Sequence, residues 1–312
     1  LAGDLDAVDR MPRRVPVPVL RPALDQCVPT GVVLGPGVRV VVMRDEGGVA
    51  DALLKQLAKL GVSALSIDPG TSTEQILEKL QAWGSEGPVA GVYWLAALDD
   101  EGLHDALDLA GWREALRRRV KALYATMRRL YDDSPFLVTG TRLGGFHGYD
   151  EAGATAPMGG AVTGFAKSYK QERPEALVKA VDLPASRKTA AVAELLVAET
   201  LHDPGCVEVG YVDGQRWGVG LASRPFPPQD APADGAMSLS ADSTVLVTGA
   251  AGSIVAAITA DLAGASGGTF HLLDLTPEPD PADPDLRRYV DDRDAFKAVL
   301  AARIKEKGER PT

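Results

Sequence analysis

Residues 244–254, TVLVTGAAGSI, decide the fold of this chain. They open with a β-branched apolar run, which is typical of a buried parallel strand. A glycine-containing turn follows, and residues 253–263 then carry apolar side chains at helical spacing. The apolar run at residues 269–275 predicts a second strand. Strand, glycine turn, helix and strand in this order predict the opening of a Rossmann-type nucleotide-binding fold.

The turn is a candidate phosphate site. A pyrophosphate would lie against the backbone amides at the positive end of the helix dipole. A side chain on Gly249 would fill that space, and Gly252 lets the turn close onto the helix. Val255 stands where a third glycine usually permits close packing of helix and strand. The residues that we predict to contact a cofactor are Gly249, Ala251, Gly252, Ser253, Ile254 and Asp274.

Asp274 bears on the choice between NAD and NADP. It ends the second strand, where a carboxylate would accept hydrogen bonds from an adenosine ribose and repel a 2′-phosphate. This favours NAD, although Arg287 or Arg288 could fold back toward a phosphate. The alternative interpretation of the whole motif is a tight strand–helix connection that binds no ligand.

The same pattern occurs twice. Residues 40–57 match residues 245–262 without a gap, 205 positions apart, and the apolar positions coincide almost throughout. The second strands of the two copies end in Asp68 and Asp274. In the first copy Arg44 replaces Gly249, and the turn becomes Arg-Asp-Glu-Gly. Carboxylates then stand where phosphates would bind, so we predict that only the second copy binds a dinucleotide.

The rest of the chain alternates strands and helices, which predicts a parallel sheet covered on both faces. The fold class is therefore α/β, a Rossmann-like doubly wound parallel sheet, duplicated, with a degenerate first copy and a cofactor-binding second copy. The predicted strands are residues 38–43, 62–67, 89–95, 136–138 and 177–183, the predicted helices residues 49–60, 72–83, 112–130, 161–169 and 295–307, and a hairpin is predicted at 207–217. The predicted domains are a linker or edge segment at 1–30, a first subdomain at 31–225, a linker at 226–242 and an incomplete second subdomain at 243–312.

Composition narrows the classes of function. The net charge of −10 argues against nucleic acid as a partner, because a phosphate-binding surface needs clustered Lys and Arg. Two cysteines without a CxxC pair argue against a disulfide framework or a zinc site and fit a cytoplasmic location. No apolar stretch approaches the length of a membrane span.

The turn at residues 248–254 resembles the TGxxGxI cofactor turn of short-chain dehydrogenases, in particular the ketoreductases of type I polyketide synthases and polyunsaturated fatty acid synthases. Residues 91–124 are similar to that family's stretch beginning at its fourth strand, and the resemblance covers roughly residues 35–275. Such ketoreductases pair a structural subdomain that has lost its cofactor site with a catalytic one that kept it. The resemblance implies NAD(P)H-dependent reduction of a β-ketoacyl thioester on the phosphopantetheine arm of an acyl carrier protein, with neighbouring synthase domains as further partners.

The catalytic residues of that family have no counterparts in the first unit. Arg119 stands in place of the active-site Lys, the serine would fall near Gly140 or Thr141, and Gly159 stands in place of the tyrosine. We therefore assign no catalytic residue and no metal ligand. The second unit stops at Thr312, before the strands that would bring its own Ser, Tyr, Lys and Asn, so we expect further chain to complete it. The segment at 277–312 resembles an insertion of the lipid-type synthase branch.

Two other functions remain as alternatives: a non-catalytic scaffold in which the second turn is also empty, and a freestanding short-chain dehydrogenase. The duplication disfavours the second of these. His147, in a glycine-rich loop, is interpreted as a structural hydrogen-bonding residue, and no histidines pair at metal spacing. Trp94, Trp112 and Trp217 are interpreted as core or packing residues.

Overall fold

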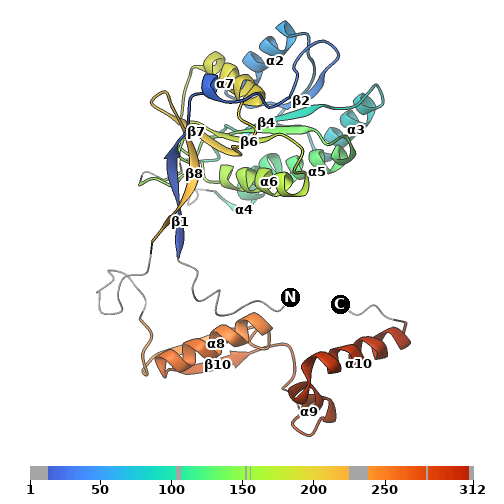
Figure 1. The fold of residues 1–312 in the computed structure, drawn as a ribbon, viewed down its shortest axis with the longest axis vertical. Coiled ribbons are helices and arrows are strands. Elements are labelled where there is room, and N and C mark those ends of the chain that lie inside the picture. Colours follow the sequence, from blue (N-terminus) through green and yellow to red (C-terminus); the bar gives the residue numbers. More distant parts are fainter. Residues whose placement is uncertain are drawn as a thin grey trace. The chain divides into compact units, whose positions relative to one another are not determined.

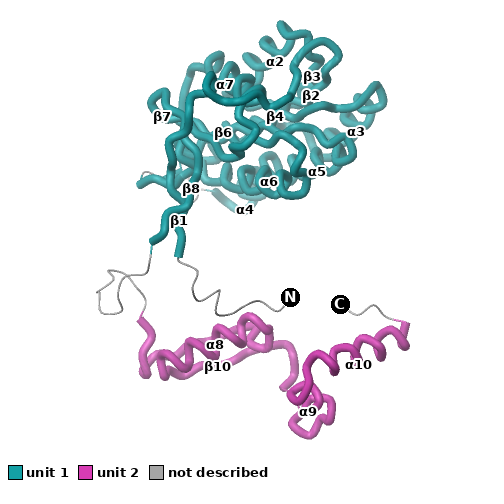
Figure 2. The backbone as a smooth tube through the Cα atoms, in the orientation of Figure 1, with its two compact units in different colours: residues 1–226 teal, residues 227–312 magenta. Residues whose placement is uncertain are grey.

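The computed structural model describes residues 13–102, 107–151, 153–154, 156–224, 238–278 and 280–308. The chain divides into two compact units, residues 1–226 and 227–312 (Figure 2). Of the predicted linkers, residues 1–12 and 226–237 lie outside the described residues.

An eight-stranded sheet forms the centre of the first unit (Figure 1). Its order is β1-β8-β7-β6-β5-β4-β2-β3, and β2 to β7 run parallel. Strand β2 lies between β3 and β4, so the strand order reverses there, which is where doubly wound folds bind ligands. The doubly wound α/β fold predicted from the sequence is confirmed. The strands are β1 (Arg14–Leu20), β2 (Arg39–Met43), β3 (Ser63–Ile67), β4 (Gly91–Ala97), β5 (Phe136–Thr141), β6 (Val178–Asp182), β7 (Glu208–Val212) and β8 (Gln215–Ser223).

Helices cover both faces of this sheet (Figure 1). On one face α2 (Val49–Lys59) and α7 (Thr189–Leu201) pack together. On the other face lie α3 (Thr73–Gly84), α5 (Ala122–Arg129) and α6 (Gly159–Glu172). Helix α4 (Leu109–Leu116) continues into α5 through the π-helical turn η3 (Arg117–Lys121), and the short 3₁₀ helices are η1 (Leu24–Gln26) and η4 (Tyr131–Asp133).

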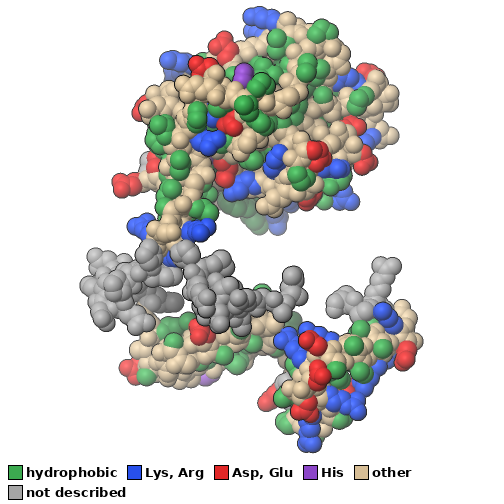
Figure 3. Space-filling model, viewed as in Figure 1, with side chains coloured by type: hydrophobic (Ala, Val, Ile, Leu, Met, Phe, Trp, Pro, Cys, Tyr) green, Lys and Arg blue, Asp and Glu red, His purple; other side chains and the backbone are tan. Residues whose placement is uncertain are grey.

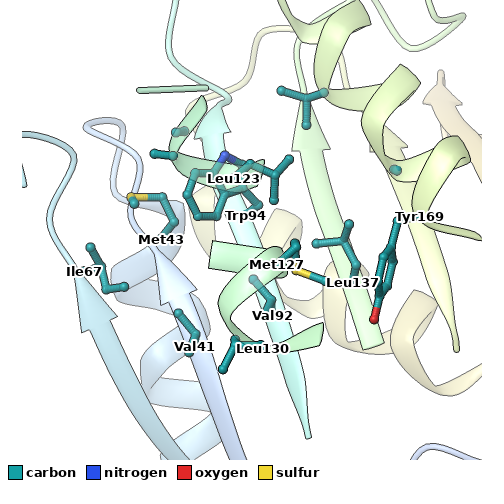
Figure 4. Packing of buried hydrophobic residues seen from close by; sticks show 14 of the residues in the cluster. Val41, Met43, Ile67, Val92, Trp94, Leu123, Met127, Leu130, Leu137 and Tyr169 are labelled. Atoms are coloured by element: carbon teal, nitrogen blue, oxygen red, sulfur yellow. The ribbon is translucent and has the colours of Figure 1, made fainter. Parts of the chain in front are cut away.

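The core beneath α3, α5 and α6 is built around Trp94 (Figure 4). This side chain is fully buried against apolar residues such as Leu123 and Met127, and its indole N–H donates to the Arg119 carbonyl at 2.9 Å. On the opposite face Tyr93 meets Phe136 edge to face at 5.4 Å. The prediction of Trp94 as a core residue is confirmed, whereas Trp112 is 40% exposed.

The antiparallel edge of the sheet consists of β7, β8 and β1. The hairpin turn places Asp213 and Gly214 at φ 50° and 76°, as the Asp-Gly pair predicted. The segment that we expected to be a linker or edge segment contains the edge strand β1. Pro16 and Pro18 lie two positions apart on this strand, so their backbone nitrogens face the same side. Because proline has no amide N–H, both residues fit only where the nitrogen faces away from β8. The sheet edge is thereby less able to pair with another strand.

The second unit contains β9 (Thr244–Thr248), α8 (Ser253–Ser266) and β10 (Thr269–Leu273), with β9 and β10 parallel. Two helices follow, α9 (Pro284–Asp291) and α10 (Arg293–Glu306). Charged side chains gather on α9 and α10, whereas the surface over α8 and β10 is largely uncharged (Figure 3).

The sequence missed two helices. Helix α7 reads TAAVAELLVAETL and is apolar on almost every side, because it packs against α2 as well as the sheet, so no 3.6-residue period appears. Helix α9 lies within the segment 277–312, where only the helix at 295–307 was predicted. Asp283 caps it, accepting from the Asp285 amide, and Pro284 occupies its first turn.

Candidate functional site

The glycine turn of the second unit is shaped by backbone conformation. Gly249 has φ +67°, a conformation that side chains disfavour, and a Cβ added there would meet no protein atom. The Gly252 amide donates to the Gly249 carbonyl at 3.1 Å, and a Cβ on Gly252 would lie 3.2 Å from that oxygen. The Ala250 amide donates to the Leu273 carbonyl at 3.3 Å, which ties the turn to β10. The absence of a side chain on Gly249 thus leaves the space above the turn open. The absence of one on Gly252 allows the turn itself to close tightly.

The N-terminus of α8 has free donors. Gly252 is its N-cap residue, and no described side chain accepts a hydrogen bond from its first turn. The Ala256 amide donates to the Gly252 carbonyl at 2.8 Å and closes the first turn of the helix. Ser253 and Ile254 are both exposed, Ile254 by 74%. The amides of this turn are therefore available to an anion.

Asp274 lies beside this turn. One of its carboxylate oxygens accepts from the Ala251 amide at 2.8 Å and the other from the Thr276 amide at 2.7 Å. These backbone hydrogen bonds hold the pKa of Asp274 below its ordinary value. The structure thus brings Asp274 and Ala251 into direct contact, and Gly249 and Gly252 belong to the same turn.

The first copy shows what an anion does at the equivalent place. The buried carboxylate of Asp45 accepts from the amides of Val49 at 3.0 Å and Ala50 at 2.7 Å, in the first turn of α2. At the repeat distance, Asp45 corresponds to Ala250, and Val49 and Ala50 correspond to Ile254 and Val255. A carboxylate of the chain itself therefore occupies in the first copy the amides that are open in the second.

Arg44 and the second acid of the first turn make other contacts. Arg44 lies 2.6 Å from Asp51 and 3.4 Å from Asp68, the counterpart of Asp274. Glu46 forms an ion pair with Arg118 at 2.6 Å. The sequence singled out both acids of this turn, but the structure shows that Asp45 alone caps α2.

Three residues of the first unit, which the sequence comparison set against catalytic positions, are engaged in packing. The Arg119 guanidinium is buried and donates to the Asp99 carbonyl at 2.8 Å, and burial lowers its pKa. The Thr141 hydroxyl donates to Asp182 at 2.8 Å. A Cβ on Gly159 would lie 3.2 Å from the Thr141 Cβ, so a tyrosine would not fit there without movement of the strand end.

Asp182, at the end of β6, organises the loop after β5. Its fully buried carboxylate also accepts from the amides of Leu143 at 2.6 Å, Gly145 at 2.6 Å and His147 at 2.9 Å. The glycine-rich loop thus wraps around this acid, and a Cβ on Gly145 would lie 2.5 Å from the Tyr211 carbonyl. The signal in the sequence was a lone acid ending a strand, a position that Asp68 and Asp274 share.

Among the described residues, no cluster of three or more His, Cys, Asp or Glu side chains could hold a metal ion. In the same part of the chain, every helix is too short or too polar to cross a membrane.

No protein-family model matches this chain, and neither does any curated protein. Several solved structures have the same fold. An adenylation, ketoreductase and pseudo-Asub multidomain structure from a keto acid-selecting NRPS module has a TM-score of 0.63 at 17% identity, covering 95% of this chain and 25% of that one. A-type ketoreductases from a modular polyketide synthase have a TM-score of 0.55 at 19% identity, over 93% of this chain and 61% of that one. An N-terminal ketoreductase from the macrolactin assembly line has a TM-score of 0.53 at 12% identity, over 98% and 60%.

This chain therefore spans between a quarter and about three fifths of the length of these structures. At such low identity the likeness is one of fold, and it runs through both units. The chain has the fold of the ketoreductases found in modular polyketide synthases and in an NRPS module.

Proposed function

We propose that this chain is the ketoreductase region of a modular or iterative type I synthase, in which the second unit binds a nicotinamide dinucleotide. The complete enzyme would reduce a β-ketoacyl thioester, carried by an acyl carrier protein, to the β-hydroxyacyl thioester. The observation that carries this proposal is the pair of helix-α8 amides, Ile254 and Val255, whose counterparts in α2 are capped by Asp45.

The electrostatics of the two turns support opposite roles. A helix N-terminus favours an anion, and Asp45 supplies one to α2 from within the chain. Ala250, its counterpart in the second copy, has only a methyl group and cannot accept a hydrogen bond. The backbone amides in the first turn of α8 would therefore be free to donate to a pyrophosphate. Gly249, Gly252 and the first turn of α8 would hold the phosphates, and Asp274 the adenosine ribose. When bound, a reduced nicotinamide supplies the hydride.

The first unit would then serve as a structural subdomain. Arg119, Thr141 and Gly159 are engaged in packing where the family has Lys, Ser and Tyr. The proton that a carbonyl oxygen needs on reduction must come from a positioned acid. We place no such acid in the first unit.

The apolar side of α8 supports completion by further structure. Leu53 and Leu57 of α2 are fully buried, whereas their counterparts Ile258 and Leu262 are 54% and 39% exposed. In the first unit the equivalent stripe belongs to one apolar core with residues of β4, β5 and α7, and α7 packs directly against α2. The second unit would need the same cover to bury its core.

The binding site is tested by introducing into the second turn the residues that close the first turn. In the full-length protein, Ala250→Asp copies Asp45, and Gly249→Arg copies Arg44. Because charge-assisted hydrogen bonds contribute about 1.5–3 kcal/mol, we expect Ala250→Asp to weaken NADH and NADPH binding at least about tenfold. Binding should be followed by the emission of the reduced nicotinamide, since all four tryptophans belong to the first unit.

Ala260→Asp is the matched control. It adds the same charge to α8 at an exposed position, whose counterpart Lys55 is exposed as well. We expect this variant to bind like the wild type. A folded wild-type protein that binds neither cofactor would instead support the scaffold function, for which Val255 in place of a third glycine is the favouring observation.

A further inference from the structure

A cavity of about 350 Å³ lies in the first unit, beside α7 and the antiparallel edge of the sheet. This volume falls at the lower end of the range for small-molecule sites. Its apolar lining comes from Leu20, Ala23, Leu24 and Leu195. Its lining also includes Arg21, Tyr211 and Arg216, which contact the ion network of β6, α7 and β8. The cavity therefore combines a hydrocarbon surface with cationic groups.

The charges beside this cavity do not balance. Lys179 and Arg216 share Glu199, at 3.0 and 2.7 Å. Arg216 and Arg21 share Asp203, at 2.8 and 3.5 Å. Three cations thus share two carboxylates, which leaves one positive charge in excess in this network of described residues. Because Lys179 and Arg216 are buried, salt and water screen this excess poorly.

Two guanidinium groups at the cavity have N–H donors to spare. The Nε and Nη2 of Arg216 donate to Glu199 at 2.7 and 3.1 Å. Its Nη1 has longer contacts, with the Pro22 carbonyl at 3.4 Å and the Cys27 Sγ at 4.0 Å. The Nε of Arg21 is buried and has no hydrogen-bond partner in the described part of the chain. A buried donor left unpaired costs free energy, so an acceptor in this cavity would be stabilising.

We propose that this cavity binds a small carboxylic acid with a short hydrocarbon tail, a function separate from that proposed for the second unit. The carboxylate would accept from Arg21 and Arg216, because the donors of a guanidinium match a planar carboxylate. The tail would lie against Leu24 and Leu195. One negative charge offsets the one excess cation, whereas a phosphate dianion would exceed it.

Binding of acetate, butyrate and hexanoate to the full-length protein is measured by isothermal titration calorimetry. We expect saturable binding whose affinity rises by up to about fourfold for each methylene group buried. Hexanol has the tail without the charge, and inorganic phosphate has charge without the tail. Both should bind at least about tenfold more weakly than hexanoate.

Two substitutions test the two parts of the site. Arg21→Gln removes the half-exposed cation and should weaken hexanoate binding at least about tenfold. Leu24→Ala should keep the preference for an anion and reduce the gain from butyrate to hexanoate. Arg14→Gln is the matched control, because Arg14 is exposed on β1, the strand that Arg21 directly follows. It should bind hexanoate like the wild type. Urea unfolding followed by tryptophan emission shows that each variant is folded.

Equal affinities for hexanol and hexanoate would overturn the proposal, and so would hexanoate binding that is the same in Arg21→Gln and Arg14→Gln. A folded wild-type protein with no saturable binding of any of the three acids would overturn it as well. Each of these outcomes leaves nicotinamide binding by the second unit untouched, so the two proposals fail separately.

Discussion

Three aspartates at strand ends or in strand–helix turns perform different tasks because different donors surround them. Asp45 accepts from two amides of α2 and closes that helix end. Asp182 is fully buried and accepts from three loop amides and a hydroxyl, which orders the loop after β5. Asp274 is exposed, and its carboxylate accepts from the amides of Ala251 and Thr276. At the scale of the residue, the surrounding donors decide whether an aspartate closes a helix end, orders a loop or faces solvent.

His147 gives the first unit a dependence of stability on pH. Its side chain is 8% exposed at φ 55°, and burial lowers its pKa, against the opposing effect of Asp182 and Glu208. The unfolded chain therefore binds a proton more readily than the folded one. We expect the free energy of unfolding to fall as the pH drops below about 6.5, by at most about 1.4 kcal/mol per pH unit.

Urea unfolding followed by tryptophan emission measures this, because all four tryptophans report on the first unit. His147→Asn, which tolerates a left-handed backbone, should flatten the slope between pH 7 and 5. His202→Asn, at the end of α7, should retain it. An identical slope in His147→Asn would refute the assignment.

At the scale of elements, buried ions join β6, α7 and β8. The fully buried Lys179 on β6 lies 3.0 Å from Glu199 on α7, which is also fully buried. Arg216 on β8 lies 2.7 Å from Glu199 and 2.8 Å from Asp203. The Lys179 ammonium also donates to the Asp203 carbonyl. This network attaches the β7–β8 hairpin to the parallel sheet, and Glu199 is the anion that two cations share.

Removing Glu199 leaves both cations buried without their shared partner. We expect Glu199→Gln to lower the free energy of unfolding by about 3–5 kcal/mol. Lys179→Met should have a smaller effect, because Glu199 remains paired with Arg216. Glu194→Gln, on the exposed side of the same helix, should change stability by less than about 0.5 kcal/mol. A loss in Glu199→Gln no greater than that in Glu194→Gln would show that the network contributes little.

At the scale of the whole molecule, the two copies of one plan differ in completeness. The first copy buries its helix stripe under a full sheet and α7. The second has two strands and the single helix α8 against them. Ile254, Ile258 and Leu262 are exposed where Val49, Leu53 and Leu57 are buried. An apolar stripe of this kind is stable in water only when other structure covers it.

This comparison predicts that Ile258 is a core residue of the full-length protein. Ile258→Asp should abolish cofactor binding and remove hydrogen-exchange protection from α8, because it would bury an unpaired charge. Ala260→Asp, two residues along the same helix, should leave both unchanged. If the two variants behaved alike, α8 would be exposed in the full-length protein too, and its stripe would have to serve another contact.

Much of the architecture was predictable because local patterns carry it. The apolar periods located β2 to β6, α2 and α3 to within a few residues, and the Asp213-Gly214 pair located the β7–β8 turn. Helix α7 escaped because burial on several sides removes the period on which such reasoning depends. The segment that contains β1 was predicted only as a linker or edge segment. Its prolines argue against a strand inside a sheet, and only the structure shows that this strand lies at a sheet edge, where prolines are tolerated.

The sequence by itself determined that one plan occurs twice, and that its glycine turn survives only in the second copy. Both conclusions follow from residue spacing and residue size, which can be read from the sequence without knowing the fold. Only the tertiary structure decided which acid closes α2: Asp45 reaches amides four and five residues along, whereas the adjacent Glu46 pairs with Arg118, 72 residues away. The contact of Asp274 with Ala251 was decided in the same way, because parallel pairing of β9 with β10 brings positions 23 residues apart to one sheet edge.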